Sequence, residues 1–273
     1  MSRVELHHGA ATDVGLVREV NEDAWLASPP VFVVADGMGG HHGGDIASRI
    51  VAEEFGRLEA DGLDSRAASA LIEQTLQQCQ RRIQEYAAQQ EGAETTRWYA
   101  GTTAVVGILV EDADVAKWLL ANLGDSRIYR FNEGVLEQVS VDHSVVQELV
   151  DAGRLSRDEM EHHPERHVVT RALGGPDLPE PDYFLLPASA VERLLLCSDG
   201  VSGMLSDDEI AAVLLDATDP RDAADRLVAA AVEAGGRDNA TAVVVDVMGW
   251  AVDATYDSER TRVSLEQKLG ALP

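Results

Sequence analysis

The middle of the chain holds apolar runs joined by very short connections, and this feature constrains the fold most strongly. Four such runs follow one another, at 102–110, 115–122, 127–131 and 136–139. Parallel strands need a crossover of about a dozen residues, whereas antiparallel neighbours are joined by tight turns. Short connections therefore predict an antiparallel meander.

Helical periodicity lies on both sides of this meander. From about 45 to 60, and again from about 66 to 90, apolar residues recur every three or four positions, as on one buried helix face. Ser206-Asp-Asp-Glu209 is a capping box, and Pro220 opens a further helix. Buried strands are expected at 31–35, 194–197 and 242–247. This order of elements predicts an α+β chain in which helix layers cover antiparallel sheets.

Three aspartates stand at the ends of these core strands. Asp36 and Asp199 each follow a buried strand and precede a glycine, and Asp238 precedes the last strand. Asp-Gly is the commonest turn dipeptide, so either pair alone would be interpreted as a turn. Its recurrence after two separate buried strands favours another interpretation, because a hard divalent cation needs several rigidly held oxygen ligands.

Two neighbouring segments contain residues of the kinds that bind phosphate or metal. Arg18 precedes Glu22 and Asp23 in a short polar stretch, which alone would be a charged turn. It offers a further carboxylate for a metal and a guanidinium fork for a phosphate. The glycine cluster 37–44 does not match a phosphate loop, because it lacks the Gly-Lys-Ser/Thr ending and His42 takes the last glycine position of GxGxxG.

Acidic residues greatly outnumber basic ones. The 273 residues include 22 Lys and Arg against 48 Asp and Glu, which gives a formal net charge of −26. Nucleic acids and anionic membranes attract basic surfaces, so neither is expected as a partner. The excess acid fits either solubility or metal binding. Without a signal sequence or an apolar run of membrane-spanning length, the expected location is the cytoplasm.

Eight motifs occur in a fixed order between about residues 9 and 247. They are Thr12-Asp-Val-Gly15 with Arg18 and Asn21-Glu-Asp-Ala24, Val34-Ala-Asp-Gly-Met-Gly-Gly-His41 with Ala47-Ser48, Gly101-Thr-Thr103, Gly124-Asp-Ser-Arg127, Asp142-His-Ser144, Thr170-Arg-Ala-Leu-Gly174, Cys197-Ser-Asp-Gly200 and Asp238-Asn-Ala-Thr241. Together they resemble the motifs of the metal-dependent protein phosphatases of the 2C (PPM) family, in their bacterial form.

The resemblance implies a fold and a domain organisation. The expected fold is a four-layer αββα sandwich, with two antiparallel β-sheets flanked by helices and a dinuclear metal cleft at one end. The phosphatase domain would occupy 1–248, with a flap insertion at about 143–182. Residues 249–273 would form a C-terminal tail.

The resemblance also assigns site residues. Two Mn²⁺ or Mg²⁺ ions would be held by Asp36, Asp199 and Asp238, by the carbonyl of Gly37, and by Glu22 or its neighbour Asp23. The catalytic residues would be Arg18, Asp36 and Asp199. Arg18 would bind the substrate phosphate, and Asp125 would serve a weaker third ion together with Asp199.

The implied reaction is hydrolysis of phosphoserine and phosphothreonine in proteins by a metal-activated water, opposing bacterial Ser/Thr kinases. Partners would be phosphorylated kinase substrates or the kinases themselves, and the chain is expected to be a monomer. Two alternatives stay open. One is a catalytically silent regulator that binds phosphoproteins, and the other is a phosphatase dedicated to one partner-switching protein.

Two positions depart from the family pattern. Some members carry a histidine general acid two residues after the first metal aspartate, where this chain has Met38, which cannot donate a proton. His41 is a candidate replacement. In many relatives an aspartate supports the third ion at the position of Gly203, so that site is expected to be weaker here. The flap also contains His162, His163 and His167. A solvated surface is the favoured interpretation of these histidines, and metal ligation is the alternative.

Overall fold

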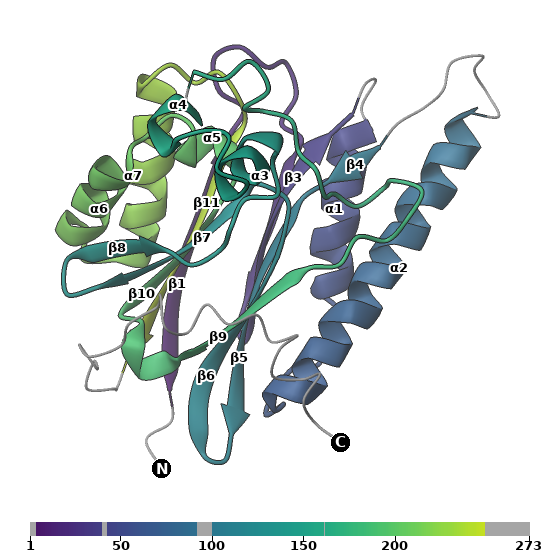
Figure 1. Ribbon diagram of the computed structural model, residues 1–273. Coiled ribbons are helices and arrows are strands. Elements are labelled where there is room, and N and C mark those ends of the chain that lie inside the picture. Colours follow the sequence, from purple (N-terminus) through teal and green to yellow (C-terminus); the bar gives the residue numbers. More distant parts are fainter. Residues whose placement is uncertain (1–3, 40–42, 92–99, 161, 249–273) are drawn as a thin grey trace.

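Two β-sheets pack face to face in the computed structural model, which describes residues 4–39, 43–91, 100–160 and 162–248 (Figure 1). One sheet has the strand order β1 (Glu5–Asp13), β11 (Ala240–Met248), β10 (Arg193–Cys197), β7 (Arg127–Asn132) and β8 (Val135–Gln138). The other has the order β2 (Asp23–Ser28), β3 (Val31–Met38), β5 (Ala104–Asp112), β6 (Val115–Leu123) and β9 (Asp182–Pro187), and β4 (Gly101–Thr102) also pairs with β3. All of these pairs are antiparallel.

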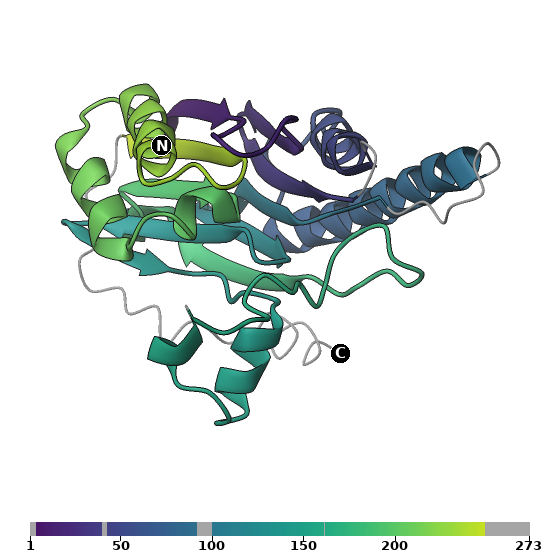
Figure 2. The same cartoon turned by 90° about the horizontal axis from the view of Figure 1, so that it is seen from above.

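Helices cover both outer faces of the sandwich. On the β3 side lie α1 (Gly43–Phe55) and α2 (Ser65–Glu91), and on the β11 side lie α5 (Asp199–Ser202), α6 (Asp207–Asp216) and α7 (Pro220–Glu233). The flap carries α3 (Val145–Asp151) and α4 (Arg157–Met160) and projects from one side in the view from above (Figure 2). A short 3₁₀ turn, Ala188–Ala190, follows β9. No helix in the described ranges combines the length and apolar character needed to cross a bilayer.

Alternation along β3 shows why four layers form. Phe32 and Val34 point between the sheets, where they join Trp118 in a fully buried core. Val33 and Ala35 point the other way and pack against α1 and α2. Because both faces of the strand are covered, its sequence is a continuous apolar run and not an alternating one. The predicted αββα sandwich is confirmed.

The predicted helix signals are also found in place. Ser206 and Glu209 form the reciprocal capping box of α6, and Pro220 occupies the first turn of α7 after the N-cap Asp219. The periodic face of α2 is buried against the sheet. The first helix ends at Phe55, several residues before the expected boundary near 60.

The predicted meander is wrong at its centre. Strands β5 and β6 pair, and so do β7 and β8, but β6 and β7 belong to different sheets. Leu120 on β6 and Ile128 on β7 face the core between the sheets from opposite sides. The turn at 124–126 therefore crosses from one sheet to the other. This crossing brings Asp125 to one end of the sandwich.

Three strands were not predicted from the sequence. They are β1, β2 and β9, and each lies at an edge of its sheet. Strands β1 and β2 bury less of their surface and lack the apolar runs that mark the central strands. Strand β9 does carry an apolar run, Tyr183–Leu186, directly after the segment predicted as a polar insertion. The expected C-terminal tail, 249–273, and His41 lie outside the described residues.

Candidate metal centre

Strand ends from both sheets meet at one end of the sandwich and surround a cavity of about 490 Å³. Its lining includes every predicted site residue except Asp23, namely Arg18, Glu22, Asp36, Gly37, Asp125, Asp199 and Asp238. These side chains come from the end of β3, from the segment after β10, from the loop before β11, from the β6–β7 turn and from the N-terminal loop. The fold thus gathers residues that are far apart in the sequence.

Glu22 and Asp23 occupy different environments. Glu22 lines the cavity, whereas Asp23 lies behind it, directly opposite Asp36 in the β2–β3 pair. Asp23 Oδ2 accepts a hydrogen bond from Ser198 Oγ at 2.7 Å. The buried Asp23 Oδ1 has no hydrogen-bond partner in the described part of the chain. Of the two neighbours, Glu22 is therefore the one that faces the cleft.

Burial and mutual repulsion raise the pKa values of four carboxyl groups. Burial, reinforced by the charge of Asp23, raises the pKa of Asp36 well above its usual range. The pKa of Asp23 is raised to about 7, mainly by burial. Burial and then Asp199 raise the pKa of Asp125 to about 8, and burial and then Asp238 raise the pKa of Asp199. Crowded acids of this kind favour a cation, which offsets both desolvation and repulsion.

The donor set fits hard divalent cations. It consists of carboxylate oxygens with a backbone carbonyl, which suit Mg²⁺ and Mn²⁺ better than softer metals. Across the described ranges, no three Asp, Glu, His or Cys side chains converge closely enough to enclose an ion by themselves. The carboxylates stand around the cavity, so water has to complete the coordination shell, as Mg²⁺ commonly requires.

Arg18 and Asp238 lie together at the cavity wall. Arg18 Nη2 donates to Asp238 Oδ2 at 2.7 Å, and both side chains are partly exposed. The buried Asn239 holds the N-terminal loop in this position through three hydrogen bonds. Its Oδ1 accepts a hydrogen bond from the Glu22 N–H at 2.8 Å, and its Nδ2 donates to the carbonyls of Val14 and Val20. Asn239 was not predicted as a site residue, although it follows Asp238 within one motif.

The turn that carries Asp125 is held on both sides. Arg127 forms a bidentate ion pair with the buried Asp142, with the Nη2–Oδ2 distance at 2.8 Å. The buried His143 accepts a hydrogen bond from the Gly124 N–H at its Nδ1, at 3.1 Å. The Asp142-His-Ser144 motif therefore fixes the position of the Asp125 turn.

Two glycines near Asp199 leave no room for a side chain. A Cβ at Gly200 would lie 1.8 Å from the Asn239 carbonyl oxygen, so this close backbone approach requires glycine. A Cβ at Gly203 would lie 2.7 Å from the Asp199 carbonyl oxygen. An aspartate could enter position 203 only if the end of α5 moved, which gives a physical reason for the departure seen in the sequence.

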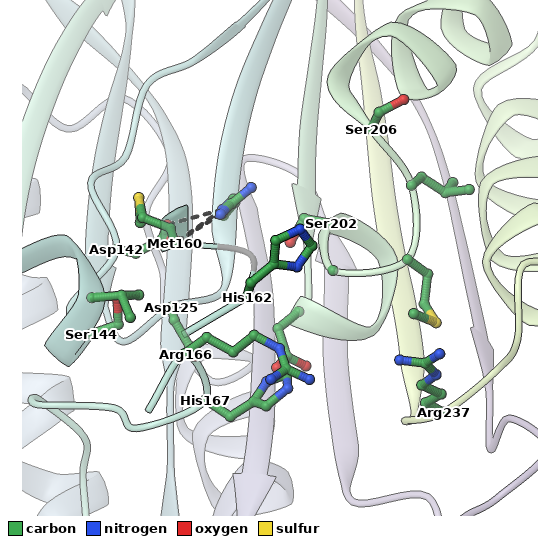
Figure 3. A pocket seen from close by; sticks show the side chains of 16 residues that line it. Asp125, Asp142, Ser144, Met160, His162, Arg166, His167, Ser202, Ser206 and Arg237 are labelled. Atoms are coloured by element: carbon green, nitrogen blue, oxygen red, sulfur yellow. Dashed lines mark hydrogen bonds and ion pairs between the residues drawn. The ribbon is translucent and has the colours of Figure 1, made fainter. Parts of the chain in front are cut away.

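A second, larger cavity of about 750 Å³ adjoins the first (Figure 3). It lies between the flap and the α5–α6 segment, and the two cavities share several lining residues: Asp125, Arg166, His167, Asp199, Gly203, Met204 and Arg237. Neither Arg166 nor Arg237 was predicted as a site residue. Arg237 directly precedes the motif that begins at Asp238, and Arg166 precedes the flap histidine His167.

Comparison with known sequences agrees with this geometry. Residues 17–234 match the profile of the family Protein phosphatase 2C. The Serine/threonine phosphatase stp of Listeria monocytogenes is 33% identical over 253 residues, which cover 88% of this chain and 96% of that protein. Serine/threonine protein phosphatase PstP of Mycobacterium tuberculosis is 36% identical over 252 residues, which are 92% of this chain and 47% of the relative.

Solved structures give the same result. The catalytic domain of PstP in complex with two manganese ions has a TM-score of 0.75 and 35% identity, and the match covers 90% of this chain and 100% of that one. Serine/threonine phosphatase Stp1 from Staphylococcus aureus has a TM-score of 0.80 and 32% identity, with 90% and 96% covered. On the sequence profile, the relatives and the shared fold, the chain belongs to the protein phosphatase 2C family.

Proposed function

We propose that this protein hydrolyses phosphoserine and phosphothreonine in proteins, using two divalent metal ions held in the smaller cavity. The observation that carries the proposal is the placement of buried, mutually repelling carboxyls beside the guanidinium of Arg18. A phosphomonoesterase needs both a cation centre and a group that binds phosphoryl oxygens. Relatives named serine/threonine phosphatases align over most of this chain, which supports the same reaction.

The residues have separate roles in this proposal. Asp36, Asp199 and Asp238 would hold the ions together with Glu22 and the Gly37 carbonyl. When bound, the ions would supply Lewis acidity and make water nucleophilic near neutral pH. Arg18 would bind two phosphoryl oxygens, and its pairing with Asp238 would fix the direction of the guanidinium. Met38 lines the cavity but has no proton to donate to the leaving oxygen, so that proton would come from water.

Release of phosphate from a phosphothreonine peptide tests the function. We expect hydrolysis with Mn²⁺, weaker hydrolysis with Mg²⁺, and loss of activity in EDTA that is restored by added Mn²⁺, since a shell of oxygen donors and water exchanges its ion readily. Malachite-green detection of phosphate measures this. A catalytically silent regulator would instead bind the peptide and release nothing. Comparable rates on several unrelated phosphoproteins would exclude dedication to one partner-switching protein.

Arg18→Ala should weaken phosphate binding more than it slows turnover. The substrate dianion already presents the oxygens that the guanidinium binds, so we expect KM to rise roughly tenfold or more while kcat falls less. Arg18→Lys should restore charge but not the fork geometry. Steady-state kinetics measures both, with Arg157→Ala in the flap as a matched control because Arg157 lines neither cavity. A large fall in kcat at constant KM would instead assign Arg18 to the transition state.

A weaker third ion is proposed at Asp125 and Asp199, the two acids that line both cavities. Gly203 adds no side-chain ligand there, and His167 is the nearest candidate from the flap. Activity should therefore keep rising with Mn²⁺ after the two tight sites fill, and Asp125→Ala should abolish only this late rise. Calorimetric titration should still show the tight sites. Identical activity curves for wild type, Asp125→Ala and His167→Ala would contradict a third ion.

A further inference from the structure

We propose that the larger cavity is a second anion subsite, which binds a phosphorylated or acidic side chain near the phosphoresidue being hydrolysed. This inference rests on the proposed function and deepens it by naming a substrate class. Its principal residues are Arg237, in the loop before β11, and Arg166, in the flap. They are specificity-determining residues for the substrate and take no part in the reacting bonds.

The two cavities form one continuous surface. Asp125 and Asp199 stand in the wall that they share, and Gly203 contributes no side chain to that wall. The larger cavity has a volume of about 750 Å³, which is ample for a substrate side chain with its phosphate. A peptide whose phosphoresidue occupies the smaller cavity can therefore extend a neighbouring side chain into the larger one.

Arg166 and Arg237 are available for a ligand. Figure 3 shows Arg166 reaching into the cavity from the flap and Arg237 standing on the opposite side. Both residues are exposed, and neither guanidinium has an ion-pair or hydrogen-bond partner in the ranges that the structure describes. In a chain with 48 acidic and 22 basic residues, acidic partners are plentiful. Two arginines without a partner in the described ranges therefore face one cavity.

The acidic side chains in the lining do not offset these two charges. Asp142 is already neutralised by its bidentate pair with Arg127. Asp125 and Asp199 lie on the side of the proposed metal centre. The remaining ionisable lining residues, His162 and His167, are neutral or positive. Guanidinium forks bind phosphate and carboxylate with matching planar geometry, so an anionic side chain is the ligand that this lining fits.

Arg237 places the larger cavity next to the residues proposed to bind the substrate phosphate. It is adjacent in the chain to Asp238, which accepts a hydrogen bond from Arg18. Consecutive Cα atoms are about 3.8 Å apart, and an extended peptide advances about 3.3 Å per residue. Because the two cavities share lining residues, we expect one short segment of a substrate to carry both anions. Elsewhere the net charge of −26 disfavours acidic segments, so this local basic wall confers selectivity.

The test compares peptides that share one phosphothreonine and differ two or three residues away. The varied residue is alanine, glutamate or a non-hydrolysable difluoromethylene phosphonate analogue of phosphoserine. We expect kcat/KM for the phosphonate peptide to exceed that of the alanine peptide about tenfold, and this ratio to fall at high salt. In Arg237→Ala and Arg166→Ala the ratio should drop severalfold, and in the double variant it should approach one. The glutamate peptide shows whether a carboxylate serves as well as a phosphate.

Arg157→Ala removes the same charge from the flap outside both cavities and should keep the wild-type ratio. Binding is measured separately by fluorescence anisotropy, with a phosphonate also replacing the phosphothreonine, so the subsite is tested even without turnover. Hydrolysis of all peptides with ratios near one would overturn the subsite and leave the proposed function intact. Absence of phosphate release together with tighter binding of the doubly anionic peptide would overturn the function and support the subsite. Equal binding of all peptides would overturn the subsite.

Discussion

Replacing Asp36, Asp199 or Asp238 by alanine is expected to lower turnover by roughly a thousandfold or more, because each removes a ligand from a two-metal centre. All three line the smaller cavity. The measurement is kcat for para-nitrophenyl phosphate at saturating Mn²⁺, with circular dichroism to show that the fold is retained. Near-normal turnover in any one variant would mean that the metals are placed wrongly.

A substitution at Asp36 should also affect stability, in the opposite direction. In the metal-free protein, the Asp36 carboxylate is buried beside other carboxylates, so its ionised form is disfavoured and its pKa is raised. Asp36→Asn removes that charge and should raise the melting temperature in EDTA at pH 8. Asp225→Ala, on the exposed surface of α7, should change neither turnover nor melting temperature. Loss of activity with gained stability separates a functional carboxylate from a structural one.

The central layers were predictable because their residues are buried on both sides. The apolar run at 31–35 has no solvent-facing position, and its last residue leads directly into Asp36 at the cleft. Edge strands such as β1 and β2 carry no such run, and their position depends on pairing with distant strands. Pairing with distant strands depends on the tertiary structure and is not visible in the local sequence. For the same reason the β6–β7 connection was predicted as a turn within one meander, although it joins two sheets.

The site was predictable only where motif residues face the cavity. Asp36 and Asp199 could be proposed from strand ends, but choosing Glu22 over Asp23 required knowing which side chain faces the cleft. Asn239 acts through three backbone contacts with a loop more than two hundred residues away in sequence. The role proposed for Arg237 depends on the flap, whose residues Met160, His162 and Arg166 line the same cavity.

Mn²⁺ should stabilise the folded protein, and more strongly at pH 8 than at pH 6. Folding raises the pKa of Asp23 to about 7 and of Asp125 to about 8, from an ordinary value of 3.8. A raised pKa means that the folded state binds the proton more tightly than the unfolded chain does. The stability that proton binding contributes is therefore complete below about pH 4 and is lost as pH rises towards 8. Metal binding instead needs ionised carboxylates and strengthens over the same interval.

Thermal unfolding in EDTA and in Mn²⁺, at matched pH values from 6 to 8, measures the difference directly. At a free Mn²⁺ concentration a hundredfold above Kd, linkage gives about 2.7 kcal/mol, or roughly 5–10 °C for a domain of this size. Groups remote from the cleft titrate equally in both samples, so their effect cancels in the difference. The difference should widen with pH in wild type and widen less in Asp125→Asn, which lacks one of the titrating carboxyls. A constant difference across this range would show that these carboxyls do not exchange protons for metal.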